Sequence, residues 1–251
     1  MEVISSVSNA KVKEIAALKM RKYRKKSGLY IVEGVKMVRE AIERGIKPKL
    51  IVVTERNSDK FTFSDRFSDR IIVTEEVYLK MSDEVTPQGV LAILEIPKNQ
   101  LSVPNGDCLF LEGVSDPGNL GTIVRTAVAA GYGEIYAADC ADFYSPKAVR
   151  SSMSGIFSAK IYAGEKEEIY SAIKECEIVA ADMDGEDVFG FMPKGKVCII
   201  LGNEANGISE RTKAYADKVL KIPMNEGIES LNVAISGAVM MYALKAARIK
   251  K

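Results

Sequence analysis

Three polar blocks in the second half of the chain hold the residues best suited to chemistry. They are DPGNLGTIVRTAVAAG (116–131), LGNEANG (201–207) and IPMNEGIESLNVAISGA (222–238). Each block follows an apolar run, and proteins of alternating strands and helices bind ligands at the carboxyl ends of their strands. The candidate side chains within the blocks are those of Asn119, Arg125, Glu204, Ser230 and Asn232.

The chain contains no histidine, which limits the available chemistry. Histidine-based triads, metal sites and general bases are excluded, so proton transfer must use Glu, Asp, Lys, Tyr, Arg or water. The four cysteines stand far apart and form neither a CxxC pair nor a zinc spacing. We therefore expect no metal site, and we expect small buried residues with reduced thiols at Cys108, Cys140, Cys176 and Cys198.

The usual nucleotide-binding signatures are absent. The segment GFMPKGKV (190–197) matches GxxxxGK, but Val197 replaces the Ser or Thr of a P-loop and the segment precedes a strand. No GxGxxG follows an apolar run, which excludes the ordinary Rossmann loop. Instead, Pro117 and Gly118 predict a turn, and Asn119 can cap the helix that follows it.

The first motif helix places Arg125 six residues after Asn119, where its side chain can reach toward a phosphate or an oxyanion. An exposed arginine on a well-capped helix is the alternative. In the second block, Gly202 lets the backbone approach a flat ligand and Glu204 can accept a hydrogen bond from it. A loop that caps the next helix is the alternative there.

The third block opens the last helix, for which Ser230 can serve as N-cap. The run SLNVAISGAVMMYAL is apolar on several sides. Such a helix is buried, either in the core or in a subunit interface.

The elements that position these blocks alternate between strand and helix. Strands are expected at 107–114, 134–139, 159–164, 177–182, 196–204 and 218–223, and helices at about 119–130, from 146, at 166–175, near 209–216 and at about 230–248. The strands are almost continuously apolar, which predicts an α/β domain with a parallel sheet covered on both faces.

The first half of the chain is a smaller α/β unit. Strands are expected at 29–34, 49–54, 70–74 and 89–96, and helices after a cap at Ser8 or Asn9, from Val35 to Arg44 before Gly45, and shortly after 74. The stretch IPKNQLSVPNG (96–106) has the composition of a linker. We predict domains at 1–96 and 107–251, joined by 97–106.

Charge is balanced overall, since 35 Lys and Arg against 34 Asp and Glu give +1. Between Lys11 and Lys26, however, eight basic residues face one acid, Glu14. Such a cluster fits contact with nucleic-acid phosphates, and a solvated helix face is the alternative. No apolar run approaches the roughly 18 residues that cross a membrane, and the N-terminus lacks a signal-peptide layout. We therefore expect a cytoplasmic protein.

Together, the three blocks resemble the three motifs of the SpoU/TrmH family of the SPOUT superfamily, the RNA ribose 2′-O-methyltransferases, over about 107–248. SNxxVKxI near the start, LYIVEGVKMVREAI (29–42) and TPQGVLAI (86–93) resemble the substrate-binding domain that often precedes it. The resemblance implies an α/β fold in which a small L30e-like α/β domain precedes a SPOUT domain with a mostly parallel sheet and a deep trefoil knot.

The resemblance also implies a cofactor, S-adenosylmethionine, a structured RNA substrate and a homodimer formed through the C-terminal domain. The polar active-site positions of the family match Asn119, Arg125, Glu204, Ser230 and Asn232. The cofactor positions match Leu201, Gly202, Ile222, Pro223, Met224 and Leu231. The expected RNA contacts are Lys11, Arg21, Lys22, Arg24, Lys25, Lys26, Lys147 and Arg150. The segment PKAVRSSMSGIF (146–157) departs from the family, because Ser154–Gly155 replaces the usual Gly-Ala.

The implied reaction moves a methyl group from a sulfonium to a ribose 2′-hydroxyl, and a dry pocket favours this loss of charge. Family accounts often make the first-motif arginine a base. Because arginine resists deprotonation, we expect Arg125 to bind phosphate and stabilise the alkoxide, while the proton passes to water or a carboxylate.

The expected substrate is 23S rRNA, since the extra domain suggests a folded target. The alternatives are tRNA methylation, base methylation on the same fold, and non-catalytic RNA binding. The joint presence of Arg125, Glu204, Ser230 and Asn232 argues against the last.

Overall fold

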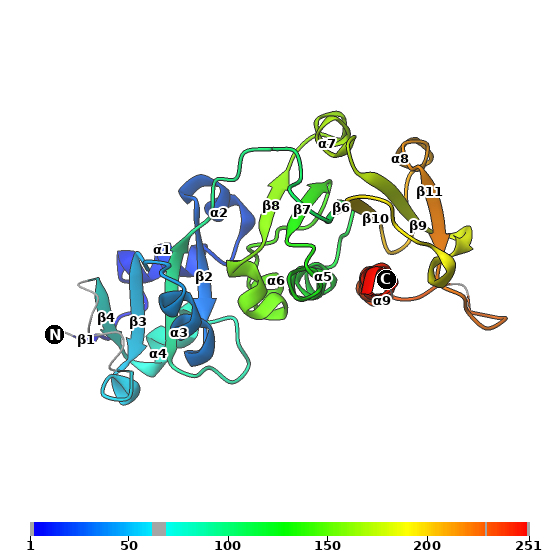
Figure 1. Cartoon of the computed structure of the whole chain (residues 1–251). Coiled ribbons are helices and arrows are strands. Elements are labelled where there is room, and N and C mark those ends of the chain that lie inside the picture. Colours follow the sequence, from blue (N-terminus) through cyan, green and yellow to red (C-terminus); the bar gives the residue numbers. More distant parts are fainter. Residues whose placement is uncertain (1–2, 62–68, 229, 250–251) are drawn as a thin grey trace. The chain divides into compact units, whose positions relative to one another are not determined.

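The computed structural model describes residues 3–61, 69–228 and 230–249. The chain forms two compact units (Figure 1). Unit 1 consists of Met1–Pro97 together with Asp142–Phe157, and unit 2 of Lys98–Ala141 together with Ser158–Lys251. The segment Asp142–Phe157 therefore packs with unit 1, although the chain on both sides of it belongs to unit 2.

Unit 2 is built on a six-stranded sheet with the order β11-β9-β10-β6-β7-β8. Every neighbouring pair in this sheet is parallel, which confirms the predicted parallel sheet. The strands are β6 (Cys108–Glu112), β7 (Glu134–Ala138), β8 (Lys160–Ala163), β9 (Glu177–Asp187), β10 (Val197–Leu201) and β11 (Lys218–Lys221). β6, β7 and β10 are buried along their whole length, as continuous apolar runs require.

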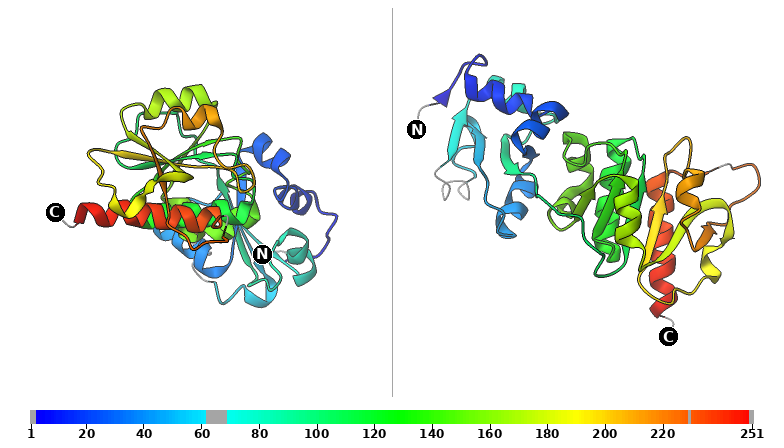
Figure 2. Two further views of the ribbon diagram at one scale, coloured as in Figure 1. Left: turned by 90° about the vertical axis from the view of Figure 1, so that its right-hand side faces the viewer. Right: turned by 90° about the horizontal axis from the view of Figure 1, so that it is seen from above.

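Helices cover both faces of this sheet (Figures 1 and 2). The helices α5 (Pro117–Ala130) and α9 (Val233–Ile249) pack against each other on one face, and α7 (Lys166–Ile173) and α8 (Glu210–Lys213) lie on the other. Alternate residues of the strands, such as Phe110, Tyr136 and Ile200, form a core with α7. Within the described residues the cysteines are free; three are buried and Cys140 is half-buried.

Unit 1 contains a mixed five-stranded sheet with the order β1-β4-β3-β5-β2, in which β5 runs antiparallel to β2 and β3. Its strands are β1 (Val3–Ile4), β2 (Leu29–Glu33), β3 (Leu50–Thr54), β4 (Arg70–Val73) and β5 (Val90–Glu95). Its helices are α1 (Ala10–Ala17), α2 (Arg21–Ser27), α3 (Val35–Glu43), α4 (Glu75–Met81) and α6 (Pro146–Ser152). The core joins α1 and α4 to the sheet through side chains such as Val12, Ile15 and Val77.

The observed helix ends show which of the predicted capping residues act as caps. Asn9 caps α1, since its side chain accepts from the amide of Lys11 at 2.9 Å, as predicted. The predicted turn before α5 was wrong: Pro117 is the first residue of the helix, because its fixed φ suits that position. The cap of α5 is Asp116 rather than Asn119, and Asp116 accepts from the Asn119 amide at 2.9 Å.

The basic segment was expected within one N-terminal helix, but the structure forms a separate helix there, α2. It ends at Gly28, whose φ of +69° suits a left-handed helix cap. No helix in the described part of the chain carries an apolar stretch long enough to span a membrane. Among the same residues, no group of three or more Cys, Asp or Glu side chains is arranged to hold a metal ion.

Candidate active site

The three motif blocks begin at one edge of the unit 2 sheet. They follow β6, β10 and β11, which are parallel members of that sheet, so their carboxyl ends share an edge. β6 and β10 are direct neighbours, whereas β9 separates β10 from β11. The first two blocks are therefore positioned for direct contact.

Glu204 joins the second block to the first. Its carboxylate accepts hydrogen bonds from the amide and hydroxyl of Ser115 at 3.1 and 2.9 Å, from the Asp116 amide at 3.1 Å and from Asn119 Nδ2 at 3.1 Å. Burial opposes the charged form, but the hydrogen bonds from Asn119 and the backbone amides outweigh it and lower the pKa of Glu204 to about 2. Glu204 is thus an ionised anchor and a poor base at neutral pH.

Asn119 extends this connection to the third block. Its Oδ1 accepts from Asn232 Nδ2 at 2.9 Å. Asn232 Oδ1 in turn accepts from the amides of Ala234 and Ile235 at 2.9 and 3.3 Å. Asn232 therefore caps α9, and the expectation that Ser230 does so was wrong. One continuous chain of hydrogen bonds now links all three blocks.

Gly202 and Asn203 give the second block its shape. Asn203 Nδ2 donates to the carbonyl of Gly113 at 2.8 Å, and its Oδ1 accepts from the amides of Ala205 and Asn206, both at 3.0 Å. A Cβ on Gly202 would lie 2.2 Å from the carbonyl carbon of Gly207, so the loop closes too tightly for any side chain there.

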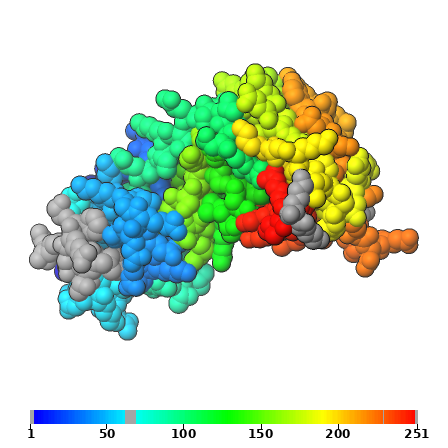
Figure 3. All heavy atoms as spheres, in the orientation of Figure 1, coloured from blue at the N-terminus to red at the C-terminus, as the bar shows by residue number. Residues whose placement is uncertain are grey.

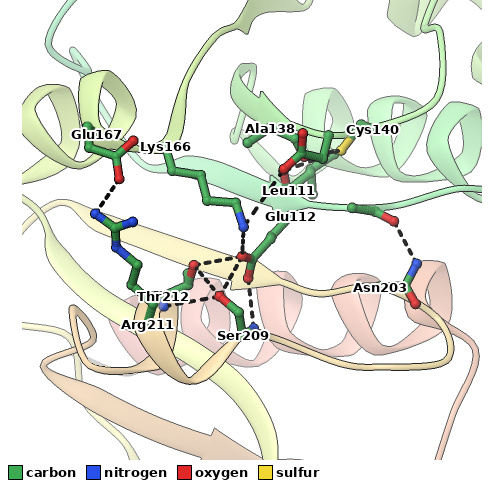
Figure 4. Close-up of polar contacts among 12 residues, drawn as sticks. Leu111, Glu112, Ala138, Cys140, Lys166, Glu167, Asn203, Ser209, Arg211 and Thr212 are labelled. Carbon is green, nitrogen blue, oxygen red and sulfur yellow. Dashed lines mark hydrogen bonds and ion pairs between the residues drawn. The ribbon is translucent and has the colours of Figure 1, made fainter.

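A cluster around Glu112, which sequence analysis missed, holds the far end of the second block. Glu112 is the last residue of β6 and is 5% exposed. Figure 4 shows Lys166, Ser209 and Thr212 pointing toward its carboxylate. The Ser209 amide donates at 3.0 Å and the Ser209 hydroxyl at 2.7 Å. Ser209 also caps α8, so Glu112 fixes the point where the loop enters that helix.

The electrostatics of this cluster keep Glu112 charged. Burial opposes ionisation, but the hydrogen bonds from Lys166, Ser209 and Thr212 outweigh it and lower the pKa of Glu112. The signal in the sequence was a carboxylate ending an otherwise apolar strand. That pattern gave no indication of its partners, which stand 54 to 100 residues further along.

The other predicted active-site residues lie apart from the network. Arg125 on α5 and Ser230 are exposed, and within the described residues neither makes an ion pair or a side-chain hydrogen bond. Leu201 and Gly202 are buried, Ile222 and Met224 half-buried, and Pro223 and Leu231 exposed. After β11, residues 222–228 extend away from the sheet of unit 2 as a loop (Figures 1 and 3).

The predicted RNA contacts all lie in unit 1. Seven of them are exposed: Lys11, Arg21, Lys22, Lys25, Lys26, Lys147 and Arg150. Arg24 is 3% exposed; it donates to Asp142 Oδ2 at 2.9 and 2.7 Å and to the carbonyl of Leu18 at 2.7 Å. Its guanidinium holds α2 against Asp142, and Arg24 is not accessible to RNA.

Comparison with known proteins gives matches along both halves of the chain. A family model described as the SpoU rRNA Methylase family matches residues 108–242, and one described as an MRM3-like substrate binding domain matches residues 9–92. The 23S rRNA (guanosine(2553)-2'-O)-methyltransferase RlmP of Bacillus subtilis is 29% identical, covering 98% of this chain and 100% of that protein. A 23S rRNA (uridine(2479)-2'-O)-methyltransferase of Streptomyces viridochromogenes is 28% identical, covering 93% and 88%.

Solved structures agree with these relatives. An AdoMet-bound rRNA methyltransferase from Sinorhizobium meliloti superposes with a TM-score of 0.89 at 28% identity, covering 99% of this chain and 98% of that one. The SpoU methyltransferase AviRb of Streptomyces viridochromogenes, in complex with AdoMet, gives 0.88 at 26% identity, covering 96% and 98%. The predicted α/β class is confirmed, while the trefoil knot stays a prediction. Since the family model spans more than half of the sequence, the chain belongs to the SpoU rRNA methylase family.

Proposed function

We propose that this protein transfers a methyl group from S-adenosylmethionine to a ribose 2′-hydroxyl of structured RNA, and that this RNA is 23S rRNA. Family membership supports the reaction, and the substrates named for two bacterial relatives support the large ribosomal RNA. The observation that carries the proposal is the hydrogen-bonded junction of the three blocks at one sheet edge, next to a helix that exposes Arg125.

The cofactor would be held mainly by backbone groups of the second and third blocks. The loop at Gly202 supports this role, since it closes so tightly against the backbone of Gly207 that the positions of its own backbone groups are fixed. We propose contacts from Leu201, Gly202, Ile222, Pro223, Met224 and Leu231. When bound, S-adenosylmethionine supplies an electrophilic methyl group on a positively charged sulfur.

Arg125 is the residue that we propose acts on the RNA. Its guanidinium is a cation with five donor N–H groups, and in the described residues no acid pairs with it. It can therefore bind a phosphate next to the target ribose and stabilise negative charge on the 2′-oxygen. Glu204 is held ionised by the hydrogen bonds that it accepts and does not take the proton, so the proton leaves to water.

The remaining polar residues divide by accessibility. Asn119 donates a hydrogen bond to Glu204 and accepts one from Asn232. We therefore propose that these three residues position the three blocks. Ser230 is exposed next to this network, and we propose that it contacts the RNA. The exposed basic residues of unit 1, without Arg24, are proposed to bind phosphates outside the methylation site.

The oligomeric state and location complete the proposal. We propose a homodimer formed through unit 2, since α9 exposes Ile235 and Tyr242 to solvent at 51% and 47%. A cytoplasmic location accords with a 23S rRNA substrate.

The test uses the full chain with S-adenosylmethionine that carries an isotope-labelled methyl group. Protein-free 23S rRNA, 16S rRNA and total tRNA are incubated separately, digested to nucleosides and analysed by mass spectrometry. We expect one labelled 2′-O-methylnucleoside from 23S rRNA. Label on a base would indicate base methylation. Label in tRNA alone would show that the substrate is tRNA and not 23S rRNA. Cofactor binding without transfer to any RNA would refute the activity.

A further inference from the structure

Unit 1 encloses a cavity of about 240 Å³ between α3, the loop from α4 to β5, and α6. One water molecule needs only about 10–15 Å³ of such space, so the cavity has room for a ligand. It is smaller than the roughly 300–1,000 Å³ of pockets that hold drug-sized molecules. Its size therefore suits a single aromatic base with part of its sugar.

The walls of the cavity are apolar and rich in methionine. Met37 is 6% exposed, Met81 is fully buried and Met153 is half-buried. Methionine side chains adapt to irregular shapes, and their sulfur atoms make favourable contacts with aromatic rings. Met153 has a φ of +48°, which residues with side chains rarely adopt. The surrounding structure holds its backbone in this conformation, and its side chain forms part of the wall.

One end of the cavity offers a carboxylate that has no hydrogen-bond donor among the described residues. This is Glu84, whose Oε1 lies 3.8 Å from the place a Cβ on Gly34 would occupy. The neighbouring Glu33 differs, since both of its oxygens accept hydrogen bonds. Burial and the charge of Glu33 raise the pKa of Glu84, while Arg150 lowers it. A half-buried carboxylate of this kind favours a ligand that donates hydrogen bonds to it.

Backbone donors stand at the same end. The first amide of α3, that of Val35, donates to Gln88 Oε1 at 2.8 Å. The next two amides, of Lys36 and Met37, have no acceptor in the part of the chain that the structure describes, as expected in the first turn of a helix. Donors and a carboxylate acceptor therefore lie together beside Gly34.

This pairing of groups selects among the bases. The Watson–Crick edge of guanine presents one acceptor, O6, next to two donors, N1–H and the N2 amino group. Glu84 can accept from both donors, while the free amides of α3 approach O6. Adenine and cytosine offer only one donor group on that edge, so they satisfy fewer of the groups in the cavity.

The rim supplies charges for a nucleic-acid backbone. Lys36 and Arg150 line the opening and are exposed. Arg150 contacts Asp83 at 3.4 Å in a pair that is exposed on both sides. Such a pair contributes little to stability, so Arg150 can exchange Asp83 for a phosphate.

We propose that this cavity binds an unstacked guanine of the RNA substrate, with the base edge on Glu84 and the amides of α3 and the ring between the methionines. The proposal rests on the proposed function in naming RNA as the source of the base. The cavity would then fix the RNA by a single base that is separate from the methylated sugar.

The test follows the ε-methyl signals of the ten methionines in the full chain by carbon-13 NMR. Signals are assigned through single Met→Leu variants. Addition of GMP is expected to move the signals of Met37, Met81 and Met153. IMP, which lacks the N2 amino group, should bind about tenfold more weakly, since it cannot make one hydrogen bond to a charged group. The pentanucleotide UUGUU should bind more tightly than GMP, and UUAUU should not compete.

The variant Glu84→Gln should bind GMP about tenfold more weakly for the same reason. Glu95→Gln makes the same chemical change at an exposed carboxylate of unit 1 and should bind as the unchanged protein does. Three outcomes would each overturn the proposal. The protein could respond equally to GMP and AMP, Glu84→Gln could bind GMP with unaltered affinity, or the protein could bind GMP but not UUGUU. These titrations contain no methyl donor, so their failure is separate from a failure of methyl transfer.

Discussion

Arg125 and Glu204 both carry a charge at neutral pH, but the fold uses the two charges differently. Glu204 is surrounded by donors from Ser115, Asp116 and Asn119, so its charge holds loops together. Arg125 projects from α5 into solvent with no acid paired to it in the described residues. A charge that has no internal partner is available to a substrate, and this difference separates the positioning residue from the reacting one.

Replacing Arg125 tests this assignment. Arg125→Ala should lower methyl transfer by about 10²-fold or more, the effect of removing an oxyanion donor. Arg125→Lys should keep part of the activity, because the charge remains while the planar fork is removed. Single-turnover methylation and cofactor titration measure the two effects, and cofactor affinity should stay unchanged. Arg211→Ala removes another exposed arginine of unit 2 as a control. Near-normal turnover in Arg125→Ala would contradict the role.

Because the pKa of Glu204 is lowered in the folded protein, we expect the stability of the protein to depend on pH. Its folded pKa of about 2 lies below the ordinary value of 4.5, so its ionised form stabilises the fold. That stabilisation is fully present above pH 4.5 and is lost as the pH falls through the folded value of about 2. The difference in unfolding free energy between the unchanged protein and Glu204→Gln should therefore shrink between pH 4.5 and pH 2. Urea unfolding at several pH values measures it, and a constant difference would argue against this account.

Among the elements of unit 2, β6, α7 and α8 meet at Glu112. The carboxylate of Glu112 is the one group that contacts α7, the end of the second block and α8 together in Figure 4. The second block is therefore held from within by Asn203 and Glu204, and just after its end by the contact of Ser209 with Glu112. A loop fixed at three points has little freedom to lose when it binds a cofactor.

Glu112→Gln should loosen the far end of this loop. Because a hydrogen-bonded charge is replaced by a neutral amide in a buried site, we expect a decrease of about 1–3 kcal/mol in unfolding free energy. The affinity for S-adenosylmethionine should fall as well, as measured by calorimetric titration. Glu167→Gln breaks an exposed ion pair between the same two helices, α7 and α8, and serves as the control. A destabilised variant with unchanged cofactor affinity would show that the cluster serves the fold alone.

The sequence predicted elements better than it predicted their ends and their partners. Strands such as β6 and β10 were predictable because uninterrupted apolar runs leave few alternatives. The caps of α5 and α9 were misplaced by three and two residues, since each helix start offers two good capping residues: Asp116 and Asn119 before α5, and Ser230 and Asn232 before α9. Which of them caps depends on hydrogen bonds to other loops.

The candidate site was predictable as a set of residues but not as an arrangement. The motif blocks pointed to Asn119, Glu204 and Asn232, and these three lie in one hydrogen-bonded chain. The cluster around Glu112 was missed because its contacts cross from β6 to α7 and α8, which no local pattern encodes. Arg24 was assigned to RNA by composition, because nothing nearby in the sequence shows that Asp142 neutralises it.

For the whole molecule, the exposed basic residues of unit 1 should govern RNA affinity. Neutralising Arg21, Lys22, Lys25 and Lys26 together should weaken RNA binding and flatten its salt dependence, by about 0.7–0.9 in log–log slope for each phosphate that the variant no longer binds. Filter binding at several salt concentrations gives the slope, and cofactor affinity should not change. Arg24→Gln offers a contrast: it should destabilise unit 1, because Asp142 loses its buried partner. An unchanged slope in the fourfold variant would mean that α2 does not contact RNA.

Dimer formation depends on the whole molecule, and the exposed apolar residues of α9 allow it to be tested. Ile235, Tyr242 and Ile249 recur at intervals of seven along this helix and are 51%, 47% and 75% exposed. Seven-residue spacing places them along one side of the helix, where water contacts an apolar stripe. A second copy of unit 2 would bury this stripe by the same two-fold contact on both copies. Ile235→Glu should therefore shift sedimentation toward the monomer, whereas Leu79→Glu, at an exposed leucine of unit 1, should not. An unchanged dimer in Ile235→Glu, or a monomeric parent protein, would remove α9 from the interface.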